Sequence, residues 1–217
     1  MANRNRLFHW QVFTILLMLF GYSGYYLCRS NFSLALPLIV DELVSRGISP
    51  TVTRIRIGTI ESLGIAAYAI GKFPAGVLSD YLGGRRNFLA GMSGSVLCIL
   101  LFAVGGGLPV FTLAWISNRL VQSLGWAGMV KVSSRWFSYH SYGPVMAIIS
   151  LSFLFGDAAS RTFLAWLIGR GLGWRGALTT LAVIVWLTSV ASFLYCRHLR
   201  RKVRADGAPE GHLQRST

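Results

Sequence analysis

Long apolar runs without charged residues dominate the pattern of hydrophobic and polar positions along the chain. Residues 87–118 and 176–196 contain no charged residue, and residues 7–28 contain only His9 as a titratable basic group. An α-helix needs about 20 apolar residues to cross the hydrocarbon core of a membrane. These runs therefore predict transmembrane helices.

Six such spans are predicted, separated by clusters of glycine and proline. Gly83-Gly84 lies between the second and third spans, residues 105–109 between the third and fourth, and residues 169–173 between the fifth and sixth. The predicted spans are 8–38, 57–79, 88–107, 110–132, 143–168 and 175–196. The expected fold is an all-α integral membrane bundle over residues 1–200, followed by a polar tail, 201–217, expected to be a disordered cytoplasmic segment or the start of a central linker.

The composition supports a membrane protein and excludes a nucleic-acid-binding protein. The chain is 53% hydrophobic and 13% charged, whereas a soluble domain carries about 25% charged residues. The net charge of +14 comes from basic residues at the ends of the apolar runs, and these form no polar face interleaved with aromatic residues. The lipid bilayer is therefore the expected partner.

The distribution of Lys and Arg predicts the orientation. With the N-terminus in the cytoplasm, most basic residues of the loops and termini lie on the cytoplasmic side. The external loops then hold Arg46, Arg54, Arg56, Arg170 and Arg175. We therefore expect a multi-pass protein of the inner (plasma) membrane with both termini in the cytoplasm.

The sequence offers no pattern for a metal, a cofactor or an enzyme. Cys28, Cys98 and Cys196 lie in or beside apolar runs, and no CxxC pair or His/Cys cluster is present. The spans also contain no pair of nucleophile and base.

Charged residues inside the spans are energetically costly in a membrane, so each is expected to be paired or to have a function. They are Arg29, Glu61, Lys72, Arg119, Asp157 and Arg161. Helical spacing places Arg29 on one face with two tyrosines, and Lys72 on one face with a tyrosine and Glu61. The tyrosines concerned are Tyr22, Tyr26 and Tyr68.

Two interpretations of these faces stay open. If both face one aqueous cavity, they form an anion site, because an arginine fork fits phosphate or carboxylate and a lysine adds a point charge. Alternatively, Glu61 pairs with Arg29 or Lys72 and no ligand is needed.

The fourth and fifth spans carry two further polar groups. Asp157 and Arg161 stand four residues apart, which predicts an intrahelical ion pair, with a proton-relay or gating role as the alternative. Arg119, Gln122 and Trp126 share a face that lines the cavity or lies in a helix interface.

The turn between the second and third spans resembles a signature of the major facilitator superfamily, G-x-L-a-D-r-x-G-r-k. The match includes Gly76, Leu78, Asp80, Gly83 and Arg85, whereas Gly84 replaces a basic position. The resemblance implies a gating role for Gly76, Asp80, Gly83 and Arg85. Gly76 is expected to allow close packing, Gly83 the turn, and Asp80 to pair with Arg85.

Residues 21–37 and 67–73 are similar to the first two helices of the organophosphate:phosphate antiporters, which include glycerol-3-phosphate and hexose-phosphate transporters. Residues 122–136 are similar to their fourth helix, and the resemblance covers roughly residues 20–200. It implies that Arg29 binds substrate phosphate and that Lys72, Tyr22, Tyr26 and Tyr68 assist.

Two departures qualify this resemblance. Glycerol-3-phosphate transporters have a substrate-binding histidine where this chain has Phe153, and family members have about twelve spans in two halves. The chain is therefore expected to be the N-terminal half, a 3+3 repeat, of an alternating-access transporter for an organophosphate or another small anion, exchanged for phosphate. A second half, or a second copy, would complete the cavity. The alternatives are a membrane-embedded metabolite sensor and an inactive truncated fragment.

Overall fold

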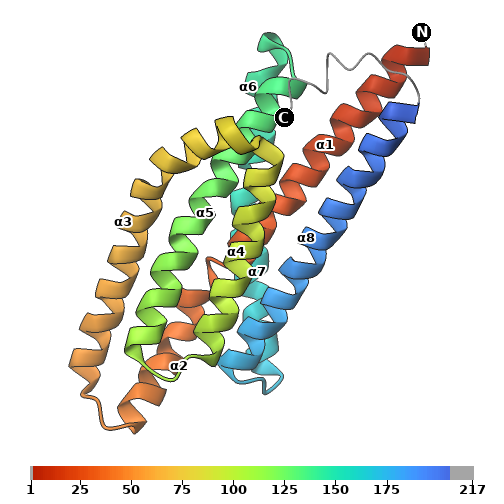
Figure 1. Ribbon diagram of the computed structural model, residues 1–217. Coiled ribbons are helices and arrows are strands. Elements are labelled where there is room, and N and C mark those ends of the chain that lie inside the picture. Colours follow the sequence, from red (N-terminus) through yellow and green to blue (C-terminus); the bar gives the residue numbers. More distant parts are fainter. Residues whose placement is uncertain (1, 206–217) are drawn as a thin grey trace.

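The computed structural model describes residues 2–205, which form a bundle of α-helices with no strand among them (Figure 1). The helices are α1 (Ala2–Leu27), α2 (Asn31–Ser45), α3 (Pro50–Leu82), α4 (Gly84–Val104), α5 (Leu108–Trp136), α6 (Tyr139–Ser150), α7 (Ser152–Gly169) and α8 (Trp174–Ala205). Helix α4 packs between α5 and α8, and α3 lies against α5 at the outer edge of the bundle.

Two of the expected spans are broken rather than continuous helices. The first, expected over residues 8–38, is interrupted at residues 28–30, and the fifth is interrupted at Leu151. At the first break the N–H groups of Arg29 and Ser30 both bond to the Tyr26 carbonyl, at 3.0 and 2.9 Å. This local rearrangement takes the Cys28 carbonyl out of the helical hydrogen-bond pattern.

Two other boundaries differ from the expectation. Helix α3 begins at Pro50, after Ser49 at the N-cap position, because proline suits the first turn of a helix. Arg54 and Arg56, expected in an external loop, therefore lie in helix α3. Helix α8 continues to Ala205, so residues 201–205 of the expected tail are helical, and residues 206–217 lie outside the described part.

Four stretches of the described chain are long and apolar enough to cross a membrane. They are Gln11–Ser45, Gly84–Val104, Tyr139–Gly169 and Trp174–Leu194. Helices α3 and α5 are long enough but are not among these stretches, and they carry charged residues such as Glu61, Lys72 and Arg119. The structure thus supports an all-α, multi-pass membrane protein.

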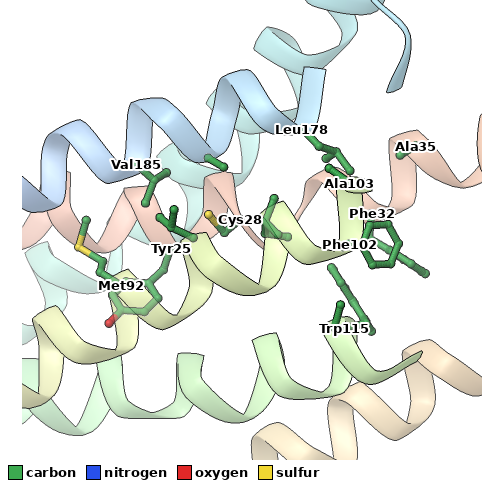
Figure 2. Packing of buried hydrophobic residues seen from close by; sticks show 14 of the residues in the cluster. Tyr25, Cys28, Phe32, Ala35, Met92, Phe102, Ala103, Trp115, Leu178 and Val185 are labelled. Atoms are coloured by element: carbon green, nitrogen blue, oxygen red, sulfur yellow. The ribbon is translucent and has the colours of Figure 1, made fainter. Parts of the chain in front are cut away.

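Aromatic and aliphatic side chains from α1, α2, α4, α5 and α8 form the core (Figure 2). The Phe32 ring stacks on Trp115 with centroids 4.3 Å apart, and Phe102 lies beside both. Toward the opposite end of α4, the Tyr25 hydroxyl donates to the Phe88 carbonyl. These contacts join the broken α1–α2 segment to the α4–α5 pair.

Glycines allow α4 and α5 to approach closely. A Cβ atom on Gly128 would lie 2.5 Å from the Gly84 carbonyl oxygen, which is a steric clash. The expected close packing at Gly76 is wrong for the described chain, since a Cβ there would meet nothing within 4 Å. Gly83 makes the turn between α3 and α4 as expected, with a φ of 82° that favours glycine.

Small residues also bring α3 against α5. A Cβ on Gly71 would lie 2.7 Å from the Ser123 hydroxyl oxygen, and Ala75 is buried. Gly71 therefore lies on the side of α3 that meets α5, and Ala75 follows four residues later, in agreement with the role of small residues in membrane helix packing.

Candidate anion-binding cavity

A hollow of about 460 Å³ lies next to the α1–α2 break. Its walls come from the end of α1, from α2, from the first half of α3, and from α5 and α7. Its polar lining consists of Tyr26, Arg29, Ser30, Ser33, Glu61, Arg119, Asp157 and Arg161. A cavity of this size is within the range of small-molecule sites.

Arg29 lies in the break itself, and aromatic rings hold its guanidinium. The guanidinium carbon is 4.7 Å from the Tyr68 ring centroid and 5.5 Å from that of Tyr26. None of the ion pairs of the described residues involves Arg29. Its charge is thus positioned by cation–π contacts, which leave it available to an anion.

The other predicted anion-site residues are distributed around Arg29. The Lys72 ammonium lies 4.9 Å from the centroid of the Tyr68 ring, the same ring that Arg29 contacts. The Lys72 side chain is exposed. Tyr22 is only 4% exposed and packs between Tyr26 and Trp126, with ring centroids 5.7 and 5.8 Å away. Tyr26 and Arg29 therefore line the hollow, Tyr68 connects Arg29 to Lys72, and Tyr22 supports Tyr26 from behind.

Glu61 pairs with a residue that the sequence did not suggest as its partner. Its two carboxylate oxygens accept from Arg119 Nη2 at 2.5 Å and from Trp115 Nε1 at 2.7 Å. The expected alternatives, pairing with Arg29 or Lys72, are not found among the described ion pairs. Trp115 and Arg119 stand four residues apart on α5, and only the packing of α3 on α5 brings Glu61 to them.

Asp157 and Arg161 form an ion pair within α7, with Arg161 Nε 2.8 Å from Asp157 Oδ2. Arg161 also lies 3.3 Å from the Ser33 hydroxyl of α2. The pair therefore joins α7 to α2 at the wall of the hollow and neutralises both charges locally.

Two buried amides of α5 stabilise the break that carries Arg29. Asn118 Nδ2 and Gln122 Nε2 both donate to the Cys28 carbonyl, at 3.0 and 3.4 Å. The group Arg119, Gln122 and Trp126 is thus divided: Arg119 lines the hollow, whereas Gln122 lies in a helix interface. Asn118 was not among the predicted site residues, and its one signal in the sequence is that it is a polar residue within a mostly apolar run.

Phe153, expected from the resemblance to stand where glycerol-3-phosphate transporters have a histidine, lies beside the predicted site. Its ring centroid is 6.2 Å from that of Tyr26. The position is therefore close to the cavity, but its side chain offers an apolar surface in place of a hydrogen-bond donor.

The residues of the signature turn form contacts at the opposite end of α3 from Pro50. Lys131 of α5 forms an ion pair with Asp80, a partner that the sequence did not suggest. Arg85 Nη2 lies 3.3 Å from the Phe193 carbonyl oxygen of α8. The expected pairing of Asp80 with Arg85 stays a prediction.

Comparison with known proteins identifies the family. The model of the Major Facilitator Superfamily matches residues 18–216. The chain is 27% identical to a probable hexose phosphate transport protein of Chlamydia muridarum, over 93% of the chain and 42% of that protein. It is 25% identical to the membrane sensor protein UhpC of Salmonella typhimurium, over 93% of the chain and 43% of that protein.

A glycerol-3-phosphate transporter of Bacillus subtilis is 25% identical over 87% of the chain and 41% of the transporter. The chain thus spans less than half the length of each of these relatives. Because the family model matches nearly all of it, the chain belongs to the major facilitator superfamily.

Proposed function

We propose that the chain forms the N-terminal six-helix half of an alternating-access transporter for a small phosphorylated metabolite, exchanged for phosphate. The main support is Arg29, a cation on the wall of a polar hollow, because tyrosine rings hold its guanidinium and it takes part in none of the ion pairs found among the described residues. The other two arginines of the hollow, Arg119 and Arg161, are each paired with a carboxylate.

In this proposal Arg29 is the main anion clamp and Lys72 increases the local positive potential. Tyr26 and Tyr68 fix the guanidinium through their rings, the Tyr26 hydroxyl donates to the ligand's oxygens, and Tyr22 keeps Tyr26 in place. Asp80, Gly83 and Arg85 control opening at the far end of the helices rather than binding the ligand, and Gly76 belongs to this gating segment.

The mechanism requires a second six-helix unit, either another half or another copy, because alternating access moves one bundle against the other around a central site. We further propose six crossings in the inner membrane, with helices α3 and α5 spanning in spite of their charges. The polar hollow supports this proposal, because Glu61 and Arg119 of these helices line it and charges inside a membrane usually face a cavity or one another.

Arg29 is tested by measuring binding of radiolabelled inorganic phosphate to the chain in lipid nanodiscs. We expect Arg29→Ala to weaken binding at least tenfold, because charge-assisted guanidinium–phosphate contacts are strong. Arg29→Lys should retain part of the affinity. Arg170→Ala is the matched control, because Arg170 also lies over an aromatic ring, that of Trp166, but outside the hollow. Equal affinity of Arg29→Ala and the parent chain would disprove the site.

A metabolite sensor is the second candidate, since one relative is named as a membrane sensor protein. Exchange assays in phosphate-loaded liposomes separate the two candidates. Arg29-dependent uptake of a labelled hexose phosphate supports transport, whereas Arg29-dependent binding without uptake, also when a second half is supplied, supports sensing.

A further inference from the structure

Glu61 already occupies a complete anion receptor formed by the chain itself. An arginine and an indole N–H, from Arg119 and Trp115, each bind one of its carboxylate oxygens. The Arg119 guanidinium also lies over the Trp115 ring, with its carbon 4.7 Å from the centroid. These are the donors that would hold a carboxylate or phosphate of a ligand.

This receptor lies in the same hollow as Arg29, and its two charges differ in exposure. The Arg119 side chain is 6% exposed and that of Glu61 is 34% exposed. The Arg119 Nε atom is buried and has no hydrogen-bond partner in the described chain. The receptor cation is thus fixed and retains an unused donor, while the carboxylate is the part that faces the hollow.

A second carboxylate in the protein has the same type of partners but a different position. Glu42 accepts from Trp174 Nε1 at 2.9 Å and from Arg175, whose guanidinium carbon lies 4.3 Å from the Trp174 ring centroid. Arg46 binds its other oxygen at 2.6 Å. This cluster fastens α2 to α8 away from the hollow, so it provides an internal reference for a purely structural Arg–Trp–carboxylate group.

We infer that Glu61 is a specificity-determining residue that occupies the second anion subsite of the cavity, centred on Arg119, and thereby restricts ligands to those with one anionic group. The inference rests on the proposed anion site at Arg29. Three guanidiniums line the hollow against two carboxylates, which leaves one cation in excess. A ligand with an anionic group at both ends would place its second anion against Glu61.

The test compares two probes, inorganic phosphate and 3-phosphoglycerate, which carries a phosphate and a carboxylate. Glu61→Gln keeps the shape of the side chain and one acceptor oxygen, removes the charge, and replaces the second acceptor oxygen with an NH2 donor. We expect the ratio of 3-phosphoglycerate affinity to phosphate affinity to rise about tenfold, because the repulsion between the ligand's second anionic group and Glu61 is removed.

Two further variants identify the origin of this gain. In Glu61→Gln combined with Arg119→Gln the gain should disappear, because the second subsite has lost its cation. Glu42→Gln should leave the affinity ratio unchanged, although it removes the same type of contact from the protein. An unchanged or lower ratio in Glu61→Gln would overturn the inference, as would a gain that persists without Arg119.

Leaving Arg119 without a counter-ion costs stability, so each variant is first checked by size-exclusion profile and thermal unfolding in nanodiscs. If Glu61→Gln does not fold, Arg119→Gln decides the matter. It leaves the Glu61 charge unneutralised and should lower phosphate affinity severalfold, whereas an unchanged affinity would overturn the inference. Absence of Arg29-dependent phosphate binding in the parent chain would instead refute the proposed site.

Discussion

At the scale of single residues, the three arginines of the hollow differ in what holds them. Carboxylates hold Arg119 and Arg161, whereas tyrosine rings hold Arg29. An aromatic ring orients a cation without cancelling its charge, since it attracts through its quadrupole. This difference favours Arg29 over the other two as the anion-binding group.

Substitutions of Tyr68 test whether the ring, rather than the hydroxyl, positions Arg29. Tyr68→Phe keeps the ring and should change phosphate affinity by less than about threefold, whereas Tyr68→Leu should weaken it about threefold to tenfold. Equilibrium binding in nanodiscs measures both. If the two variants lose affinity equally, the hydroxyl is the important group and the cation–π contacts contribute little.

Much of this site follows from the sequence, because helical spacing alone places Arg29 with Tyr26 and Lys72 with Tyr68. The pairing of Glu61 with Arg119 does not follow from it. Those two residues lie on different helices, and their meeting depends on how α3 rotates and slides against α5, which the local pattern does not determine.

At the scale of elements, α4 and α5 pack closely against each other at the centre of the bundle. The glycines at 84 and 128 face each other across this interface, and each would direct a Cβ at the other's carbonyl oxygen. Because helices in lipid associate mainly through close packing, this contact should contribute strongly to stability.

Gly128→Ala should therefore destabilise the protein, by about 1–3 kcal/mol from overpacking. Gly58→Ala is the control, since Gly58 also lies inside a helix, does not precede a proline, and would place a Cβ with nothing within 4 Å of it. That variant should be neutral or slightly stabilising, because alanine favours the helix over glycine. Thermal unfolding in nanodiscs reports both, and equal midpoints for the two variants would contradict the packing argument.

The helix break at residues 28–30 is a second feature of this scale. The amides of Asn118 and Gln122 satisfy the Cys28 carbonyl, because an unpaired carbonyl at membrane depth is costly. The sequence around the break is apolar on both sides and does not predict the break. The polar groups that stabilise the break belong to another helix, α5.

At the scale of the whole molecule, ion pairs join neighbouring helices at both ends of the bundle. Glu42, Arg46 and Arg175 join α2 and α8 near the end of α4, where Arg175 also donates to the Gly105 carbonyl at 3.1 Å. Near the start of α4, Asp80 pairs with Lys131. If α4 spans the membrane, these two clusters lie on opposite sides.

Labelling of introduced cysteines tests the proposal of six crossings. Gly106→Cys lies after α4 and Ser138→Cys lies after α5, so a crossing by α5 places them on opposite sides. We expect a membrane-impermeant maleimide to label Gly106→Cys in intact cells, and Ser138→Cys only after permeabilisation, in each case above the level of the parent chain. Labelling of both in intact cells would show that α5 does not cross.

The sequence by itself determined the membrane-embedded helical class, because uncharged runs of this length cannot be accommodated in a soluble fold, and its signature residues indicated the superfamily that the family model confirms. It also placed Arg29 beside tyrosines, since helical periodicity is a local property. Only the tertiary structure decided that α1 and α2 are separate helices, that Gly84 and Gly128 rather than Gly76 allow close packing, and that Arg119 neutralises Glu61. These features depend on contacts between residues far apart in the chain, and their geometry is set by the packing of whole helices.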